Sequence, residues 1–193
     1  MSENDEKVLA EGRRALEGWQ TPAEFIAKVE ELVSPVKSDK LFSLPSVGFL
    51  LDAMILAEFM KLRPSDKVRL VEQRRQWPDG QSGTPQKPID IEITEVLEEG
   101  RKRGDEYREG KKPSDGNVEE WHRRAEAIPA QLEKAIQRKI DKRYAGKCTL
   151  LIYLNMSNYG VLQTETEAAI AAVKFKYVAS FDEINILWQG KCY

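Results

Sequence analysis

The sequence has little of the chemistry that metal-binding and disulfide-stapled domains depend on. It contains a single histidine, His122, and two cysteines, Cys148 and Cys192. The cysteines form no Cys-x-x-Cys pair and do not follow the spacing of a disulfide framework, so the sequence argues against a structural zinc site and against a stapled secreted fold. We therefore expect a reduced, cytoplasmic protein.

Long apolar runs and an excess of one charge are also missing. No stretch approaches the roughly 20 apolar residues of a membrane span, and the polar start MSENDEKV lacks the apolar core of a signal peptide. The 30 basic residues are balanced by 32 acidic ones, which gives a formal net charge of -2. The overall charge thus does not indicate a membrane or nucleic-acid partner.

The charges are nevertheless unevenly distributed. Residues 1–35 carry eight acids and four basic residues, whereas residues 133–147 carry six basic residues and two acids. Such asymmetry is found on one-sided binding surfaces, but ordinary solvent-facing helices produce it more often. Both interpretations of the basic segment stay open.

With 193 residues, of which 41% are hydrophobic, the chain is long enough for one globular domain with a core. Its best helix signal is Thr21, Pro22 and Glu24, which combine a capping box with proline at the first helical position. The apolar periodicity predicts helices over 5–19, 22–33, 46–62, 129–144 and 164–175. It predicts strands over 67–75, 77–81, 89–96, 148–156 and 183–191.

This order of elements predicts an α/β (α+β) fold, with a mixed central sheet of about five strands flanked by helices. In the strand over 89–96, alternation places Asp90, Glu92 and Thr94 on one face and three isoleucines on the other. If Asp79 lies on the neighbouring strand, its carboxylate can meet that of Glu92. Carboxylates gathered in this way need a counter-charge, which Mg²⁺ supplies. The simpler interpretation is a solvent-facing strand after a Pro-Asp turn.

A family resemblance favours the first interpretation. Pro78-Asp79, a gap, and Glu92-Ile93-Thr94 at the end of a strand resemble the signature of the PD-(D/E)XK, or restriction-endonuclease-like, superfamily. More narrowly, RLVEQRRQWPD, IEITEV, GRKRGDEYR, LEKAIQRKIDKRY and LLIYLN resemble segments of a group of uncharacterised bacterial proteins. The resemblance implies a restriction-endonuclease-like domain over 46–193, preceded by an N-terminal helical extension over 1–45.

The resemblance also assigns roles. Asp79 and Glu92 would bind Mg²⁺ or Mn²⁺, with Asp90 or Glu58 assisting. Thr94 stands where the family has its catalytic lysine, and a hydroxyl brings no positive charge to that place. Relatives exist in which this lysine has moved to the following helix, and Lys139 falls on the apolar stripe of that helix. The alternative is that the Lys139 side chain extends past its apolar neighbours into water.

Two functions follow from the resemblance. The first is a metal-dependent nuclease that hydrolyses phosphodiester bonds of DNA or RNA. The alternative is a catalytically inactive protein of the same fold that acts as a binding or regulatory module, for instance as a homodimer. In the nuclease hypothesis, phosphates would be contacted by basic residues of two segments. These residues are Arg101, Lys102, Arg103, Arg138, Lys142 and Arg143.

Overall fold

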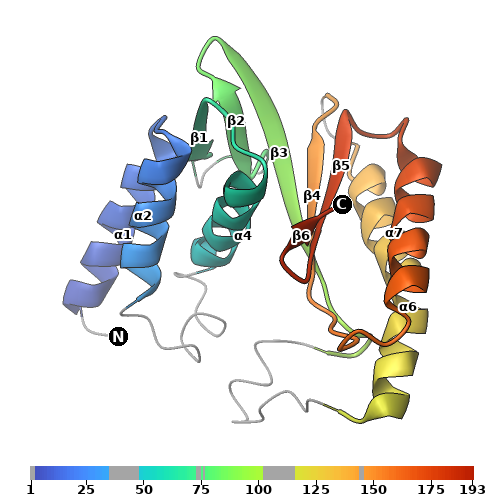
Figure 1. Ribbon diagram of the computed structural model, residues 1–193. Helices are drawn as coiled ribbons and strands as arrows, with labels where there is room; N and C mark the ends of the chain where they lie inside the picture. Colours follow the sequence, from blue (N-terminus) through green and yellow to red (C-terminus); the bar gives the residue numbers. More distant parts are fainter. Residues whose placement is uncertain (1–2, 35–47, 73–74, 76, 102–115, 144–145) are drawn as a thin grey trace. The chain divides into compact units, whose positions relative to one another are not determined.

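The computed structural model describes residues 3–34, 48–72, 75, 77–101, 116–143 and 146–193. These residues form an α+β structure, with five helices and a six-stranded mixed sheet of order β1-β2-β3-β4-β5-β6 (Figure 1). This confirms the predicted fold class, with one strand more than expected. The described residues up to Ile91 form one compact unit and those from Glu92 onward form a second. The predicted boundary after residue 45 stays a prediction.

Helices α1 (Glu3–Glu17), α2 (Pro22–Val33) and α4 (Phe49–Leu62) belong to the first unit. The predicted capping box at the start of α2 is confirmed: Glu24 N–H donates to the Thr21 hydroxyl over 3.3 Å, and Thr21 N–H donates to the Glu24 carboxylate over 2.8 Å. Helix α4 is almost entirely apolar and is buried along most of its length, as its composition predicts. The buried side chains of these helices include Leu16, Phe25, Val29, Leu50, Leu56 and Met60.

The first unit also contains β1 (Lys67–Leu70), β2 (Gly80–Thr84) and the first half of β3 (Lys87–Val96), which pair antiparallel in that order. The predicted strand over 77–81 is placed too early, because Pro78 has no N–H for a ladder hydrogen bond. A two-residue turn at 85–86 joins β2 to β3. Strand β1 is also shorter than predicted, since it ends at Leu70.

The second unit contains the end of β3, α6 (Val118–Asp141), β4 (Thr149–Leu154), α7 (Gln163–Tyr177), β5 (Glu183–Trp188) and β6 (Lys191–Cys192). Strands β4 and β5 are parallel, and α7 lies between them in the chain, so β4-α7-β5 is a crossover unit. Strand β6 turns back antiparallel on β5, which makes the sheet mixed. The strand β4 is buried along nearly all its length, as its nearly continuous apolar sequence indicates.

Two helix starts differ from the prediction. Helix α6 begins at Val118 and carries Pro129 in its interior, whereas the sequence analysis placed its start at Pro129. The missed signal is a second capping box: Glu120 N–H donates to the Asn117 side chain over 3.0 Å. Helix α7 starts at Gln163 after Leu162, which has a φ of 51°, whereas the sequence predicts a start at residue 164.

Candidate functional site around Glu92 and Lys139

Strand β3 supplies the acidic residues singled out by the sequence. Its extended backbone is confirmed, and its middle is covered on both faces, because Ile91, Glu92 and Ile93 are all buried. Asp90 and Thr94 are half-buried. Of the three isoleucines predicted on the other face, Ile91 and Ile93 are buried, whereas Ile89, next to the turn, is 46% exposed.

Lys139 of α6 pairs with the buried carboxylate of Glu92. Its Nζ atom lies 2.6 Å from Glu92 Oε1 and donates a second hydrogen bond to the Ile93 carbonyl over 2.9 Å. The side chains of Lys139 and Glu92 are only 12% and 3% exposed. Of the two interpretations of Lys139 that the sequence leaves open, the structure therefore supports the one in which it faces the sheet rather than the one in which it extends into water. Its catalytic role stays a prediction.

A second cation reaches the same carboxylate. Lys142 lies one turn further along the chain from Lys139, with its Nζ 3.9 Å from Glu92 Oε1 and its side chain 57% exposed. Lys139 thus supplies the buried hydrogen-bonded charge and Lys142 a weaker, solvent-screened one. The negative charge of Glu92 is balanced by the protein itself.

Asp90 also finds its partner within the protein. Gln81 Nε2 donates to Asp90 Oδ1 over 2.6 Å, and the Arg69 guanidinium donates to Gln81 Oε1 over 2.9 and 2.7 Å. These three residues face one another in the register of β1, β2 and β3. The Arg69 guanidinium also lies over the ring of Trp19, 4.9 Å from its centroid. This ladder could not be predicted from the sequence, because identifying the three partners requires the strand register.

Asp79 belongs to the first unit and Glu92 to the second. The Asp79 N–H donates to the carbonyl of Ile91 over 3.1 Å, so the chain just before β2 runs beside β3, as predicted. The Asp79 side chain lines a polar cavity of about 140 Å³ together with Asp52 of α4 and Arg13 of α1. Each unit is described by itself, and a joint pocket of Asp79 and Glu92 stays a prediction.

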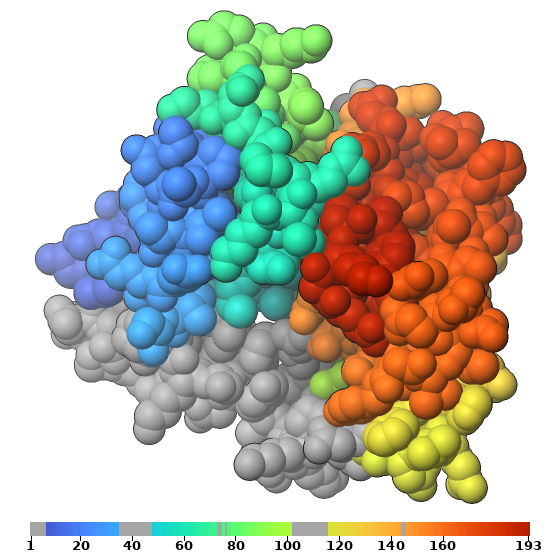
Figure 2. All heavy atoms as spheres, in the orientation of Figure 1, coloured from blue at the N-terminus to red at the C-terminus, as the bar shows by residue number. Residues whose placement is uncertain are grey.

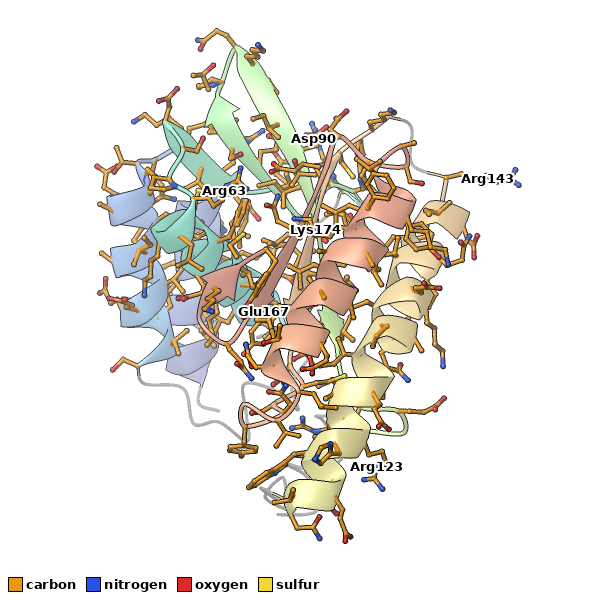
Figure 3. All side chains as sticks on the ribbon, turned by 45° about the vertical axis from the view of Figure 1, so that its right-hand side comes forward. Arg63, Asp90, Arg123, Arg143, Glu167 and Lys174 are labelled. Atoms are coloured by element: carbon orange, nitrogen blue, oxygen red, sulfur yellow. The ribbon has the colours of Figure 1, made fainter. Side chains whose placement is uncertain are left out.

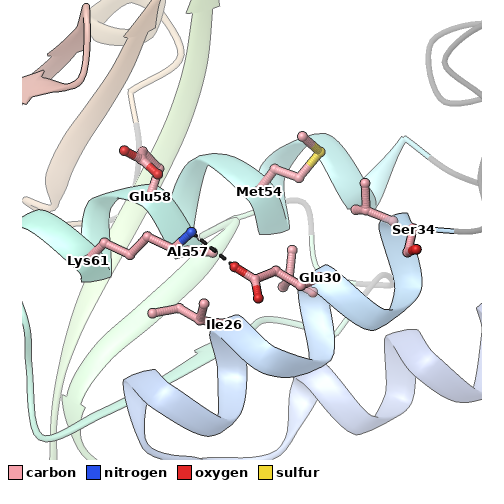
Figure 4. Close-up of a pocket in the computed structure, with 9 residues that line it drawn as sticks. Ile26, Glu30, Ser34, Met54, Ala57, Glu58 and Lys61 are labelled. Atoms are coloured by element: carbon pink, nitrogen blue, oxygen red, sulfur yellow. Dashed lines mark hydrogen bonds and ion pairs between the residues drawn. The ribbon is translucent and has the colours of Figure 1, made fainter.

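Glu58 lines a different cavity from Asp79. This cavity, of about 300 Å³, lies between α2 and α4 and has walls that include Ile26, Val29 and Met54. Figure 4 shows Lys61 reaching across it to Glu30, an ion pair of 3.1 Å. The acid of α4 that shares a cavity with Asp79 is therefore Asp52 rather than Glu58. The assisting role of Glu58 stays a prediction.

The described residues around Glu92 do not favour a divalent cation. Among the described residues, no group of three or more His, Cys, Asp or Glu side chains is placed to hold a metal ion. Of the predicted ligands, Glu92 has Lys139 against one oxygen, and Asp90 accepts a short hydrogen bond from Gln81. Mg²⁺ needs several oxygen ligands in near-octahedral geometry, and a lysine ammonium on the same oxygen competes with it directly.

The predicted phosphate contacts fall into two groups. Arg138, Lys142 and Arg143 are exposed at the C-terminal end of α6, where Figure 3 shows Arg143 projecting outward. Arg101 is half-buried, and its guanidinium makes a long contact of 3.5 Å with the Asn155 carbonyl. Lys102 and Arg103 lie outside the described residues. The α6 group alone therefore presents three basic side chains together.

A separate polar cluster in the second unit joins α7 to the C-terminal residues of the chain. Glu167 of α7 accepts hydrogen bonds from Gln163, from the Tyr193 hydroxyl and from Lys191. These bonds lower the pKa of Glu167 to about 2. Burial, followed by the bond to Glu167, raises the pKa of Tyr193 to about 12. The cluster fixes α7 against β6 and lies outside the predicted site.

Comparison with models of known protein families, with curated proteins and with solved structures found no match. The resemblance to the PD-(D/E)XK superfamily therefore stays a prediction. None of the helices in the described ranges combines the length and apolar character needed to cross a membrane.

Proposed function

We propose that this protein is a non-hydrolytic binding module with a nuclease-like fold, and that it binds the phosphate backbone of nucleic acid through the basic end of α6. The observation that carries the proposal is the 2.6 Å pair between Lys139 and Glu92. In the nuclease hypothesis this carboxylate binds a cation that activates water. Here the carboxylate is already neutralised by a cation of the protein.

The charges around Glu92 argue against an added metal ion. A divalent cation on this carboxylate would lie close to the ammonium of Lys139 and near that of Lys142. Like charges this close raise the free energy of the bound state, most of all where water is excluded. The predicted co-ligand Asp90 accepts a 2.6 Å hydrogen bond from Gln81 through Oδ1, and a metal ion on that oxygen would have to compete with this bond.

The exposed cations on α6 supply the binding surface. Arg138 and Arg143 are exposed, and neither side chain makes an ion pair within the described ranges. Lys142 lies between them in sequence. Guanidinium groups bind phosphate oxygens in a bidentate manner, so two arginines and a lysine suit a phosphate backbone. Cations at a helix C-terminus also stabilise the helix dipole, and a binding assay separates the two roles.

The test is fluorescence anisotropy of the full chain with labelled single- and double-stranded oligonucleotides. The triple variant Arg138→Ala, Lys142→Ala, Arg143→Ala is expected to lose binding and to reduce the salt dependence by about three ion contacts. Arg123→Ala is the matched control, because Arg123 is an exposed arginine at the other end of α6 (Figure 3). Equal binding by the wild type and the triple variant would overturn the proposal.

The same geometry favours one other candidate, a metal-dependent phosphodiesterase. Lys139 brings a positive charge to Glu92, which is what the missing lysine at Thr94 would have supplied. Gel analysis of the oligonucleotides with Mg²⁺ and with Mn²⁺ decides between the candidates. Cleavage by the wild type that disappears in Glu92→Ala would establish the enzyme and exclude the non-hydrolytic module.

A further inference from the structure

Helix α7 is apolar on two opposite faces. One face packs into its unit through Thr166, Ile170 and Val173, which are buried. The opposite face is exposed and consists mainly of apolar side chains at helical spacing: Ala168, Ala171, Ala172, Phe175 and Val178. Figure 2 shows the atoms of α7, in orange, at the surface. A helix that is apolar on both faces usually buries both, so the exposed face needs a partner.

The largest side chains of this face are strongly exposed. Phe175 is 82% exposed and Val178 is 65% exposed. They lie at the C-terminal end of α7, whereas the N-terminal and central positions of the face are alanines. A second α7 placed antiparallel would set Phe175 of each copy over the region of Ala168 in the other. Alanines near the twofold axis would let the two backbones approach closely.

The charged residues on the two edges of this face are also arranged so that two antiparallel copies complement each other. Glu165 and Lys176 lie on one edge of the face, and Glu167 and Lys174 lie on the other. Figure 3 shows the latter two on the same side of α7. Both pairs are centred on the same point of the helix, between Ile170 and Ala171. An antiparallel copy therefore brings each glutamate opposite a lysine, whereas a parallel copy would bring like charges together.

From these patterns we infer that a second copy of this chain docks on the exposed face of α7, helix against helix and antiparallel. The contact is isologous, since each copy offers the same face to the other. Glu165, which is exposed, meets Lys176 of the other copy. Lys176 is 56% exposed and now pairs with Glu133, an exposed pair that is easily shared or exchanged. The contact can extend at most along the 15 residues of α7, which is a length of about 22 Å.

So short a contact is at the small end of specific interfaces, and we expect a dissociation constant on the order of micromolar. Sedimentation of the full chain across the micromolar range should show a reversible monomer–dimer equilibrium. Phe175→Glu places a charge in the apolar face, opposite the region of Ala168 in the other copy, and should weaken the dimer about tenfold or more. Val118→Glu is the matched control, because Val118 is an exposed aliphatic residue, 55% accessible, at the start of a different helix, α6.

The antiparallel register has its own test. Glu165→Lys and Lys176→Glu should each weaken the dimer, and the two together should restore it, because the pair is re-formed with its charges exchanged. Circular dichroism checks that every variant is folded. A chain that stays monomeric throughout the concentration range overturns the inference, as does a dimer that Phe175→Glu leaves intact. A double charge variant no tighter than either single one overturns the antiparallel arrangement.

Discussion

Replacing Lys139 with methionine removes the buried cation and keeps much of the side chain's apolar volume. It leaves Glu92, whose side chain is 3% exposed, without its 2.6 Å partner, and it removes the hydrogen bond to the Ile93 carbonyl. Breaking a buried pair by removing one partner costs about 3–5 kcal/mol. Lys142 can move closer to Glu92 from 3.9 Å and lessen the loss, so we expect about 3 kcal/mol.

Thermal unfolding followed by circular dichroism measures this loss. For a chain of this size, about 3 kcal/mol corresponds to a fall in Tm of roughly 6–12 °C. Lys134→Met is the control, because Lys134 makes an exposed 3.4 Å pair with Glu99 that should contribute about 1 kcal/mol or less. Replacing both members, as Lys139→Met with Glu92→Leu, should recover most of the stability. A loss in Lys139→Met no larger than in Lys134→Met would refute a buried, structural ion pair.

Three further predictions concern the scaffold. Because the pKa of Glu167 is lowered to about 2, its contribution to stability is present above the unfolded pKa of about 4.5 and is lost as pH falls towards 2. Because the pKa of Tyr193 is raised to about 12, its contribution to stability is lost as pH rises from about 10 to 12. Both pH dependences are measured by urea unfolding; in Glu167→Gln the acid one should disappear, whereas the alkaline one should shrink only in part, because burial is the larger cause of the raised pKa of Tyr193. Gly83→Ala should destabilise by about 1–3 kcal/mol, since Gly83 has a φ of 94° and an added Cβ would lie 2.7 Å from the Lys87 carbonyl oxygen; an unchanged urea midpoint would contradict this. Asn117→Ala should cost about 1 kcal/mol through loss of the α6 cap, and an unchanged unfolding curve would show that the cap contributes nothing.

The sequence predicted elements whose signals are local. The capping box of Thr21 and Glu24, the apolar α4 and the buried β4 are read from a few neighbouring residues, and the structure confirms them. Helical spacing places Lys139 on the apolar stripe of α6 but leaves open whether its side chain faces the sheet or extends into water, and the structure shows that it faces the sheet. The start of α6 was missed because Pro129 is a strong helix-start signal, and the capping box at Asn117 was overlooked.

Features that depend on partners distant in the sequence were not predictable. The counter-charge required by the acids of β3 was assigned to a metal ion, because the alternation on one strand says nothing about neighbouring elements. The structure supplies Lys139 from α6 for Glu92 and Gln81 from β2 for Asp90. Identifying these partners requires the strand register and the position of α6 beside β3, which single-sequence patterns do not contain.

Isothermal titration of Mn²⁺ into the wild-type protein and Glu92→Gln tests the central claim most directly. Because the Lys139 ammonium takes the place of a metal ion at Glu92, neither protein should show a saturable heat of binding. Stoichiometric Mn²⁺ binding by the wild type that is lost in Glu92→Gln would contradict it.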